Sequence, residues 1–306
     1  MNYNSNQAGT SPYKDPVSCR CSDIPKPTNA ASNHLLDFAQ QKIFLSLNHC
    51  NLPSRLLGSP TYQCHPVPLE LDGVHTLHRR LFEALDGLEE AAARAQLFAA
   101  HMDAHFSLHH PQEAGAESSS SRVRTRANYL RVLRGWGFSS EGREGAVLKG
   151  WAESRFGLVT RYHKEPLPHP ESMAYARFLA ERSSGLYGTH ALEAQLDLVY
   201  SFVQYELNRR YPGVSRLRLY RGFNAADAHE LLSHESDGCA MLLLNNLSSF
   251  SLDRERADEF GDRVIEVCVP LSKIFCMYGL IPGLPRGEAE AMVLGGVYAL
   301  KLVSRY

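Results

Sequence analysis

The sequence predicts an α+β fold, in which a mainly helical N-terminal half precedes a half that is rich in β-strands. Between about residues 31 and 185, apolar residues recur every three or four positions, which is the period of a helix with one buried face. From about residue 216 the period changes to two, which is typical of strands. Helices and strands that occupy separate parts of a chain are characteristic of this class.

The composition is that of an ordinary soluble globular protein. Of 306 residues, 44% are hydrophobic and 21% are charged, and the net charge is −1. We therefore expect no binding to nucleic acid or membranes. No apolar run reaches the roughly 18 residues of a membrane-spanning helix, and the first residues lack the apolar core of an export signal. The seven scattered cysteines predict reduced thiols in a cytoplasmic protein.

Two groups of residues resemble parts of a metal site. Cys19 and Cys21 lie close together in a proline-rich segment, and His101 and His105 would share one face of a helix. Zinc sites of known type have a C-x₂₋₄-C pair matched by a second pair, or the motif HExxH. The sequence has neither pattern, so we expect no bound metal.

The first half divides into a tail and a helical region. Residues 1–30 are rich in Asn, Ser and Pro without periodicity, and they predict a flexible tail. Residues 31–185 predict a helical region that docks a target or a regulator. Within it, residues 122–156 predict two helices divided at residues 135–137, with Ser139 or Ser140 as the N-cap of the second.

This pair of helices carries five arginines, which allows two interpretations. Two helices around a glycine-containing turn could form a DNA-binding helix-turn-helix, but the net charge gives no support to that function. We favour a basic face that docks an acidic protein. The arginines are Arg122, Arg124, Arg126, Arg131 and Arg134.

The second half begins with a helix predicted from about His190 to Arg210, which residues 211–213 (Tyr-Pro-Gly) end. A strand is predicted at residues 216–223 and a short helix at residues 226–234. An apolar stretch that ends in a strand follows, and then a helix at residues 253–260 with Asp253 as its N-cap. The last predicted strands, joined by turns, are RVIEVCVPL, KIFCMYG, EAEAMVLGG and VYALKLVS.

Polar residues at the ends of these strands are candidates for a site. Arg221 ends the first strand, where its planar guanidinium can bind a phosphate, and Gly222 allows a backbone to come close to a ligand. Ser249 and Ser251 precede a predicted helix, where serines are usually caps or turn residues. Taken alone, each of these features is also expected of an ordinary surface.

A pair of glutamates follows a loop rich in proline and glycine. On a strand, Glu288 and Glu290 would point to one face, roughly 7 Å apart, with Ala289 on the other face. Two carboxylates so close raise each other's pKa when they are buried, so each needs a partner. A lone pair of this kind is also found on solvated strand edges.

Taken in order along the chain, these motifs resemble the R-S-E class of mono-ADP-ribosyltransferases. The resemblance covers roughly residues 186–303 and implies that residues 186–306 form an NAD-binding catalytic region of two packed, mainly antiparallel sheets with flanking helices. Phe250 stands where the class usually has threonine. The matching segments are Tyr220-Arg221-Gly222, Ser249-Phe250-Ser251-Leu252 and Glu288-Ala289-Glu290.

A closer resemblance, from about residue 31 to the end, is to the NAD-dependent ADP-ribosyltransferases of dinitrogenase reductase. It rests on the segments LRGWGFSSEGREGAVLKGWAESRFGL and RLRLYRGFN. The implied target is an arginine of dinitrogenase reductase, the iron protein of nitrogenase, whose modification reversibly switches off nitrogen fixation. NAD⁺ is the implied co-substrate, and a PII signalling protein is the implied regulator.

The resemblance implies a role for each matching residue at the NAD⁺ end of the site. Glu290 would stabilise the oxocarbenium-like transition state at the ribose, and Ser249 would orient Glu290. Arg221 would bind the pyrophosphate. Gly222 would leave backbone groups free for the nicotinamide amide, and Ser251 belongs to the same NAD-binding motif.

At the acceptor end, Glu288 would orient the target arginine and take its proton. The loop of residues 279–287, with Pro282, Pro285 and Arg286, would face the target protein. Two alternatives stay open, namely an ADP-ribosyltransferase with a different protein target, and a non-catalytic regulator that binds NAD or protein.

Overall fold

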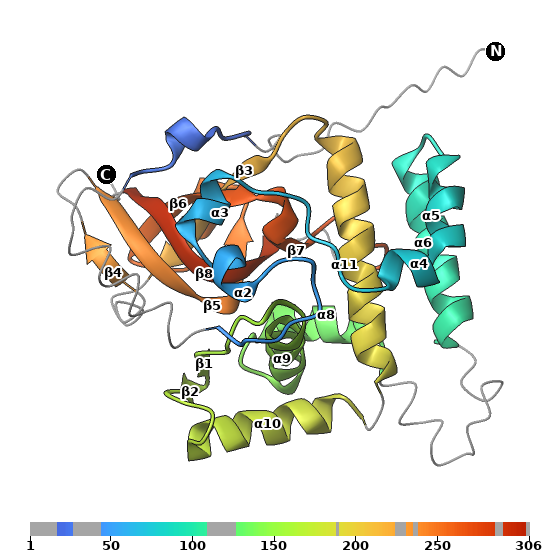
Figure 1. Cartoon of the computed structure of the whole chain (residues 1–306), viewed down its shortest axis with the longest axis horizontal. Coiled ribbons are helices and arrows are strands. Elements are labelled where there is room, and N and C mark those ends of the chain that lie inside the picture. Colours follow the sequence, from blue (N-terminus) through green and yellow to red (C-terminus); the bar gives the residue numbers. More distant parts are fainter. Residues whose placement is uncertain are drawn as a thin grey trace, which may run out of the picture.

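The computed structural model describes residues 17–26, 44–108, 127–187, 190–223, 231–234, 238–284 and 290–303. In these ranges, helices pack around an antiparallel sheet (Figure 1), which confirms the predicted α+β class. The elements of the first half are η1 (Cys21–Asp23), α2 (Ser54–Leu57), α3 (Pro60–Cys64), α4 (Val74–Leu77), α5 (Arg79–Asp86), α6 (Ala91–Phe106), α8 (Tyr129–Phe138), α9 (Arg143–Phe156), β1 (Tyr162–His163), β2 (Glu165–Pro166) and α10 (Met173–Gly185).

Six described strands form one antiparallel sheet in the order β4-β5-β3-β6-β8-β7, and β5 also pairs along β8. The sequence predicts two packed sheets, whereas these strands are joined as one sheet that curls until β5 meets β8. It does so because β5 and β8 are long enough to pair with neighbours on both sides. The strands are β3 (Arg216–Phe223), β4 (Leu231–His234), β5 (Cys239–Ser251), β6 (Arg263–Pro270), β7 (Ile274–Met277) and β8 (Glu290–Val303).

The final strand is continuous where the sequence predicts two strands and a turn. Gly296 has a φ of +113°, and a Cβ there would lie 2.7 Å from the Cα of Gly58. At Gly295 a Cβ would lie 1.9 Å from the carbonyl oxygen of Asn245. Both glycines therefore allow neighbouring backbones to approach closely inside a strand, which is the second common use of glycine besides turns.

Two other local predictions are wrong. Residues 231–234, placed at the end of a predicted helix, form β4 because they pair with β5. Residues 135–137 do not divide two helices, since α8 runs through them and α9 begins after Gly142 without a serine cap. A Cβ at Gly135 would lie 2.5 Å from Cγ of Glu144, so this glycine makes room for α9 to pack on α8.

One hydrophobic core joins the helices to the sheet. The predicted long helix is confirmed as α11 (Ala191–Arg210), which lies between β7 and α6 (Figure 1). Phe98 of α6 stacks on Phe202 of α11 with ring centroids 4.0 Å apart. Beside them, Arg94 and Glu206 form a buried ion pair. The division of the chain at residue 186 stays a prediction.

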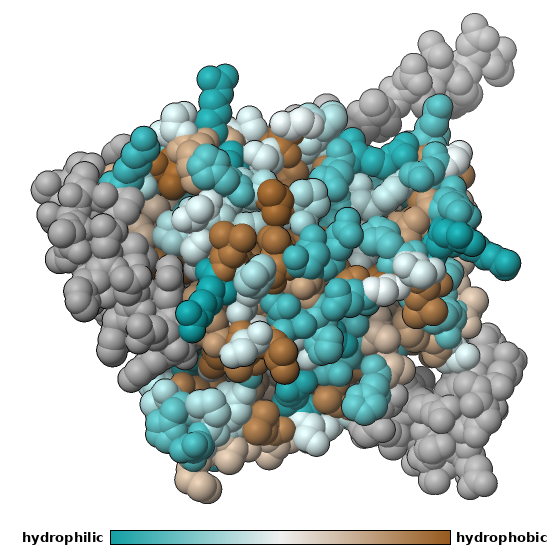
Figure 2. Space-filling model, viewed as in Figure 1, coloured by the Kyte–Doolittle hydropathy of each residue, from teal (hydrophilic) through white to brown (hydrophobic). Residues whose placement is uncertain are grey.

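Hydrophobic residues are scattered among hydrophilic ones on the face shown in Figure 2, as on most protein surfaces. No helix in the described ranges is long and apolar enough to cross a membrane. The remaining elements are α12 (Arg254–Asp258), which packs on β3, and η3 (Leu271–Lys273), which leads into β7.

Residues 17–19 pair with β3, although the sequence predicts a flexible tail there. The N–H of Arg218 donates to the carbonyl of Val17 at 2.8 Å, and the N–H of Cys19 donates to the carbonyl of Arg216 at 3.2 Å. This part of β3 is open to pairing, because β5 meets β3 only at Tyr220. Backbone groups that lack a neighbouring strand are satisfied here by the N-terminal segment.

The prediction of reduced thiols is wrong for four of the cysteines. Disulfides join Cys19 to Cys268 and Cys21 to Cys64, with Cα atoms 5.8 and 4.9 Å apart. The partners are 249 and 43 residues apart in the sequence, so their spacing gives no sign of the pairing. Cys50 and Cys276 are free thiols, and both are buried.

Lys273 is a buried lysine whose ionisation makes the free energy of unfolding depend on pH. Its side chain is 1% exposed, and Nζ lies 4.3 Å from the ring centroid of Tyr298. Burial lowers its pKa to about 7. Between this value and the ordinary value of about 10.4, the unfolded chain binds more protons than the folded one, so the free energy of unfolding rises with pH by up to about 1.4 kcal/mol per unit.

We expect Lys273→Met to remove this contribution to the slope. Urea unfolding at several pH values between about 7 and 10 gives the free energy of unfolding of wild type and variant. The difference between the two at each pH isolates Lys273, because the other titrating groups cancel. Parallel curves for the two proteins would show that Lys273 stays protonated in the folded state.

Candidate active site

A cleft with a volume of about 530 Å³ opens beside the sheet. This volume is within the range of small-molecule sites. The cleft is lined by five residues that the sequence predicts to bind NAD⁺ or to act in catalysis, namely Arg221, Gly222, Ser249, Ser251 and Glu290. The structure therefore brings together residues from three strands that are far apart in the sequence.

The ladder between β5 and β8 places Ser249 next to Glu290. Ser251 is directly opposite Glu290, and Ser249 is two residues earlier on β5, so the three side chains share one face. The hydroxyl of Ser249 donates a hydrogen bond to the Oε1 of Glu290. The serine thus holds the carboxylate in one orientation.

A β-bulge in β5 decides which side chains face Glu290. The pairing of β5 with β8 shifts by one residue between Leu244 and Leu247. One extra residue in a strand moves every later side chain to the opposite face. Without the bulge, Phe250 would share the face of Glu290, and Ser249 would point away from the cleft.

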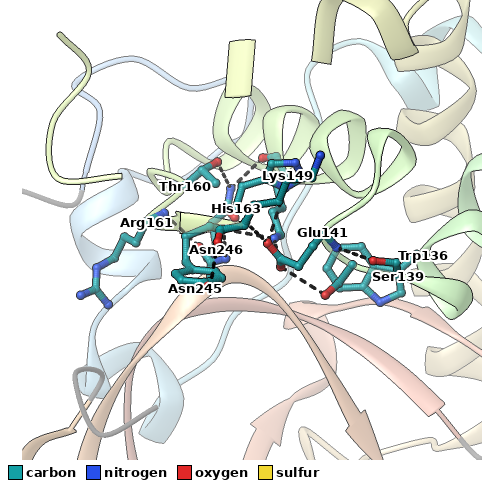
Figure 3. Close-up of polar contacts among 12 residues, drawn as sticks. Trp136, Ser139, Glu141, Lys149, Thr160, Arg161, His163, Asn245 and Asn246 are labelled. Atoms are coloured by element: carbon teal, nitrogen blue, oxygen red, sulfur yellow. Dashed lines mark hydrogen bonds and ion pairs between the residues drawn. The ribbon is translucent and has the colours of Figure 1, made fainter. Parts of the chain in front are cut away.

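The helical half holds this bulge in place (Figure 3). Asn245 accepts from the N–H of Arg161 at 2.9 Å and donates to the carbonyl of Tyr162 at 2.9 Å. Asn246 donates to the carbonyl of Lys149 in α9 at 2.7 Å. The helical half therefore helps to set the register on which the position of Ser249 depends.

Arg221 lies on β3 next to the same serine. Its Nη1 donates to the carbonyl oxygen of Ser249 at 3.4 Å. Gly222 follows, and a Cβ there would lie 2.5 Å from the carbonyl oxygen of Ala257 and 2.8 Å from the nitrogen of Gly261. The visible reason for this glycine is therefore the close packing of α12 on β3, and its predicted role at nicotinamide stays a prediction.

Ser251 supports the turn that leads into α12. Its hydroxyl accepts from the N–H of Asp253 at 3.0 Å. Asp253 is the N-cap of α12, as predicted, because its carboxylate accepts from the N–H of Glu255 at 2.9 Å. Ser251 lines the cleft as well, and its binding of NAD⁺ stays a prediction.

Trp136 is a site residue that sequence reasoning missed. Its indole N–H donates to the hydroxyl of Ser249 at 2.8 Å, and its side chain is almost fully buried. A hydroxyl that accepts from an indole and donates to a carboxylate has its proton aimed at that carboxylate. The signal in the sequence is a tryptophan between two glycines, a pattern that predicts a break between helices.

An ion pair between a buried lysine and a half-buried glutamate lies in the wall of the cleft (Figure 3). Lys149 donates from Nζ to Glu141 at 2.6 Å and to the carbonyl of Tyr162 at 3.1 Å. Burial acts to raise the pKa of Glu141, but the charge and hydrogen bond of Lys149, helped by the backbone N–H of Lys164 and by His163, lower the pKa overall. Glu141 is therefore a carboxylate at neutral pH, and it neutralises Lys149.

Two exposed phenylalanines, Phe138 and Phe260, also line the cleft. Exposed aromatic rings at the edge of a cleft offer flat apolar faces to a planar ligand. Sequence reasoning did not select either residue, because neither belongs to a motif.

The loop before Glu290 is only partly described. Pro282 lies in a turn whose residues Ile281 and Leu284 are buried, and Arg134 of α8 donates to the carbonyl of Gly283 at 2.6 Å. The described part of the predicted acceptor loop is thus anchored on α8. The other predicted acceptor residues, Pro285, Arg286 and Glu288, lie outside the described residues.

The predicted basic face makes contacts within the protein. Arg134 binds the loop, and Arg131 lies 3.7 Å from a carboxylate oxygen of Glu144 and over the ring of Tyr187. These two arginines therefore already have partners. The three others, Arg122, Arg124 and Arg126, lie outside the described residues.

Comparison with known proteins agrees with the contents of the cleft. A family model described as dinitrogenase reductase ADP-ribosyltransferase matches residues 47–302. The chain is 38% identical over 259 residues to the NAD(+)–dinitrogen-reductase ADP-D-ribosyltransferase of Rhodospirillum rubrum. The matched region covers 84% of this chain and 94% of that protein. No solved structure gives a significant match. The chain therefore belongs to the dinitrogenase reductase ADP-ribosyltransferase family.

Proposed function

We propose that this protein transfers ADP-ribose from NAD⁺ to an arginine of dinitrogenase reductase and so reversibly switches off nitrogen fixation. Its family and the name of its Rhodospirillum rubrum relative support the donor and the target. The observation that carries the chemistry is the hydrogen bond from Ser249 to Glu290, inside a cleft that Arg221 also lines.

In this mechanism the cleft binds NAD⁺ through its charged and aromatic residues. Arg221 binds the pyrophosphate, since a guanidinium fork matches two phosphate oxygens. Its contact with the carbonyl of Ser249 keeps the anion close to Glu290. Phe138 and Phe260 offer ring faces against which the planar groups of NAD⁺ can stack.

The reaction breaks one C–N bond and forms another at C1′ of the ribose. The electron pair of the broken bond leaves with nicotinamide, and positive charge develops on the ribose. The carboxylate of Glu290, aimed by Ser249, stabilises this charge. A guanidinium nitrogen of the acceptor then attacks C1′ and loses a proton, for which Glu288 is the proposed base.

Trp136 is expected to act as a positioning residue in this mechanism. Trp136→Phe keeps an aromatic ring but removes the N–H that orients Ser249. We expect kcat to fall about fivefold, because one hydrogen bond contributes about 1 kcal/mol. The KM for NAD⁺ should change little, since Trp136 is not proposed to touch the donor.

The other tryptophan provides a matched control. Trp151 donates its N–H to Asp197 at 2.7 Å, and it does not line the cleft. Trp151→Phe should lower the Tm and leave kcat unchanged. Equal kcat values for wild type and Trp136→Phe would contradict the positioning role.

Incubation with labelled NAD⁺ and purified dinitrogenase reductase tests the function itself. Label on an arginine of dinitrogenase reductase is expected. Label only on other proteins of an extract would favour an ADP-ribosyltransferase with a different target. Binding of NAD⁺ without transfer to any protein would favour a non-catalytic regulator.

Further features belong to the same proposal. The curled antiparallel sheet serves as an ADP-ribosyltransferase-type catalytic region at residues 186–306, and the protein acts in the cytoplasm. A PII signalling protein regulates it through the helical part of residues 31–185. The resemblance of the motifs supports these features, and the contacts from α8 and α9 to Ser249 and the bulge give the helical part a physical route to the site.

A further inference from the structure

Three histidines outside the cleft bring their ring nitrogens together. They are His78, at the junction of α4 and α5, and His101 and His105, in the second half of α6. One nitrogen from each ring lies within 4.8 Å of the others. The Nδ1 of His78 is 3.0 Å from the Nε2 of His101, and none of the three lines the cleft.

The backbone gives each of these rings a defined position. His101 and His105 are four residues apart on α6, and their rings are nearly parallel, with centroids 5.5 Å apart. His78 links two helices, because its N–H donates to Val74 at 3.0 Å and its carbonyl accepts from Leu81 at 2.9 Å. Its side chain is only 4% exposed, so burial restricts its rotation.

This arrangement fits the coordination of a zinc-like ion. Imidazole nitrogens bind Zn²⁺ at about 2.0–2.1 Å, so two tetrahedral ligands lie about 3.3 Å apart. The nitrogens of His78 and His101 are already close to that separation, at 3.0 Å, in a hydrogen bond that the metal ion would replace. His105 is exposed, so its ring can move the short distance that remains. Within the described residues this cluster contains no carboxylate, which disfavours Mg²⁺ and Ca²⁺.

We propose that His78, His101 and His105 bind a divalent transition-metal ion of the zinc class, with water at the fourth position. The ion would fasten the junction of α4 and α5 to the end of α6. Since α6 packs on α11 through Phe98 and Phe202, the ion would stabilise the helical half and take no part in the transfer reaction.

The sequence predicts no metal because HMDAH lacks the glutamate of HExxH. The third ligand comes from His78, 23 residues before His101. A spacing of this kind belongs to no short motif, so only the packing of α6 against the junction of α4 and α5 reveals the cluster.

Metal titration of the chelator-treated protein tests the proposal. Co²⁺, whose tetrahedral complexes absorb in the visible, should bind with one equivalent per chain, and Zn²⁺ should displace it. Saturating Zn²⁺ should raise the Tm by about 3 °C. His101→Gln should weaken the apparent affinity for Co²⁺ at least about tenfold, because even the loss of a residue that only hydrogen-bonds to a metal ligand weakens metal binding by about that much. His75→Gln changes an exposed histidine of α4 outside the cluster and should bind as wild type does.

A second group, Cys21, Cys64 and His65, also has ligand atoms within 4.8 Å of one another. Reduction of the Cys21–Cys64 disulfide would free its two thiols for metal binding, so His65→Gln is a necessary arm. Binding that is lost in His65→Gln but kept in His101→Gln would overturn the proposal, as would a wild type that binds no stoichiometric metal. If His101→Gln does not fold, His105→Ala repeats the test, since His105 is at an exposed position. An unchanged metal affinity of the His105→Ala variant would also overturn the proposal.

Discussion

Replacing Glu290 with glutamine is expected to lower ADP-ribose transfer and NAD⁺ hydrolysis together, by about 10²- to 10³-fold, which is the cost of losing one electrostatic contact to a transition state. Both reactions pass through the same positive charge on the ribose. The amide oxygen of glutamine can still accept from Ser249, so the change removes the charge and keeps the hydrogen bond seen in the structure. Initial rates of both reactions with labelled NAD⁺ measure the effect.

A glutamate elsewhere in the sheet gives the control. Glu266 lies on β6 opposite Tyr220 and pairs with Arg218 at 3.3 Å, and it does not line the cleft. Glu266→Gln should keep both rates. If Glu290→Gln kept wild-type kcat and only bound NAD⁺ more weakly, Glu290 would be a binding residue and the proposed mechanism would be wrong.

Replacing Glu288 with glutamine is expected to separate the two reactions. Transfer to arginine should be abolished and part of the NAD⁺ hydrolysis should remain, because water can replace the acceptor at C1′. We expect the ratio of transfer to hydrolysis to fall at least about 10²-fold, the typical contribution of a general base. The prediction rests on the place of Glu288 two residues before Glu290, since Glu288 lies outside the described residues.

This ratio is measured with dinitrogenase reductase as the acceptor, from protein-bound label and from free ADP-ribose in one reaction. Glu259→Gln, at an exposed position after α12, is the matched control and should keep the wild-type ratio. Equal loss of both activities in Glu288→Gln would refute the role in orienting the acceptor.

Elements with a complete local signal were predictable from the sequence. The helix α11 has an apolar stripe and a Tyr-Pro-Gly end, β3 alternates, and α12 has Asp253 as its cap. In each case the residues that decide the structure are neighbours in the chain. The grouping of Arg221, Ser249 and Glu290 at one cleft was predictable for a different reason, because their order along the chain resembles that of a known family.

Features that join distant residues were not predictable in this way. The disulfides, the N-terminal segment on β3 and the histidine cluster all depend on contacts between segments that are far apart in the sequence. The sequence does not reveal the role of Trp136, because the glycine beside it predicts a break between helices. In the fold, Gly135 makes room for Glu144 of α9 and leaves α8 intact.

By itself, the sequence determined the class of fold and the order of the main elements, and it selected three residues that line one cleft, Arg221, Ser249 and Glu290. Only the tertiary structure decided that Ser249 faces Glu290, because this depends on a one-residue bulge at Asn245 and Asn246. Hydrogen bonds from α9 and from the segment after it keep this bulge in place. A strand has a period of two, so a single extra residue exchanges its faces. No local pattern records that extra residue, since it is stabilised by hydrogen bonds to a part of the chain that lies some 80 to 100 residues earlier.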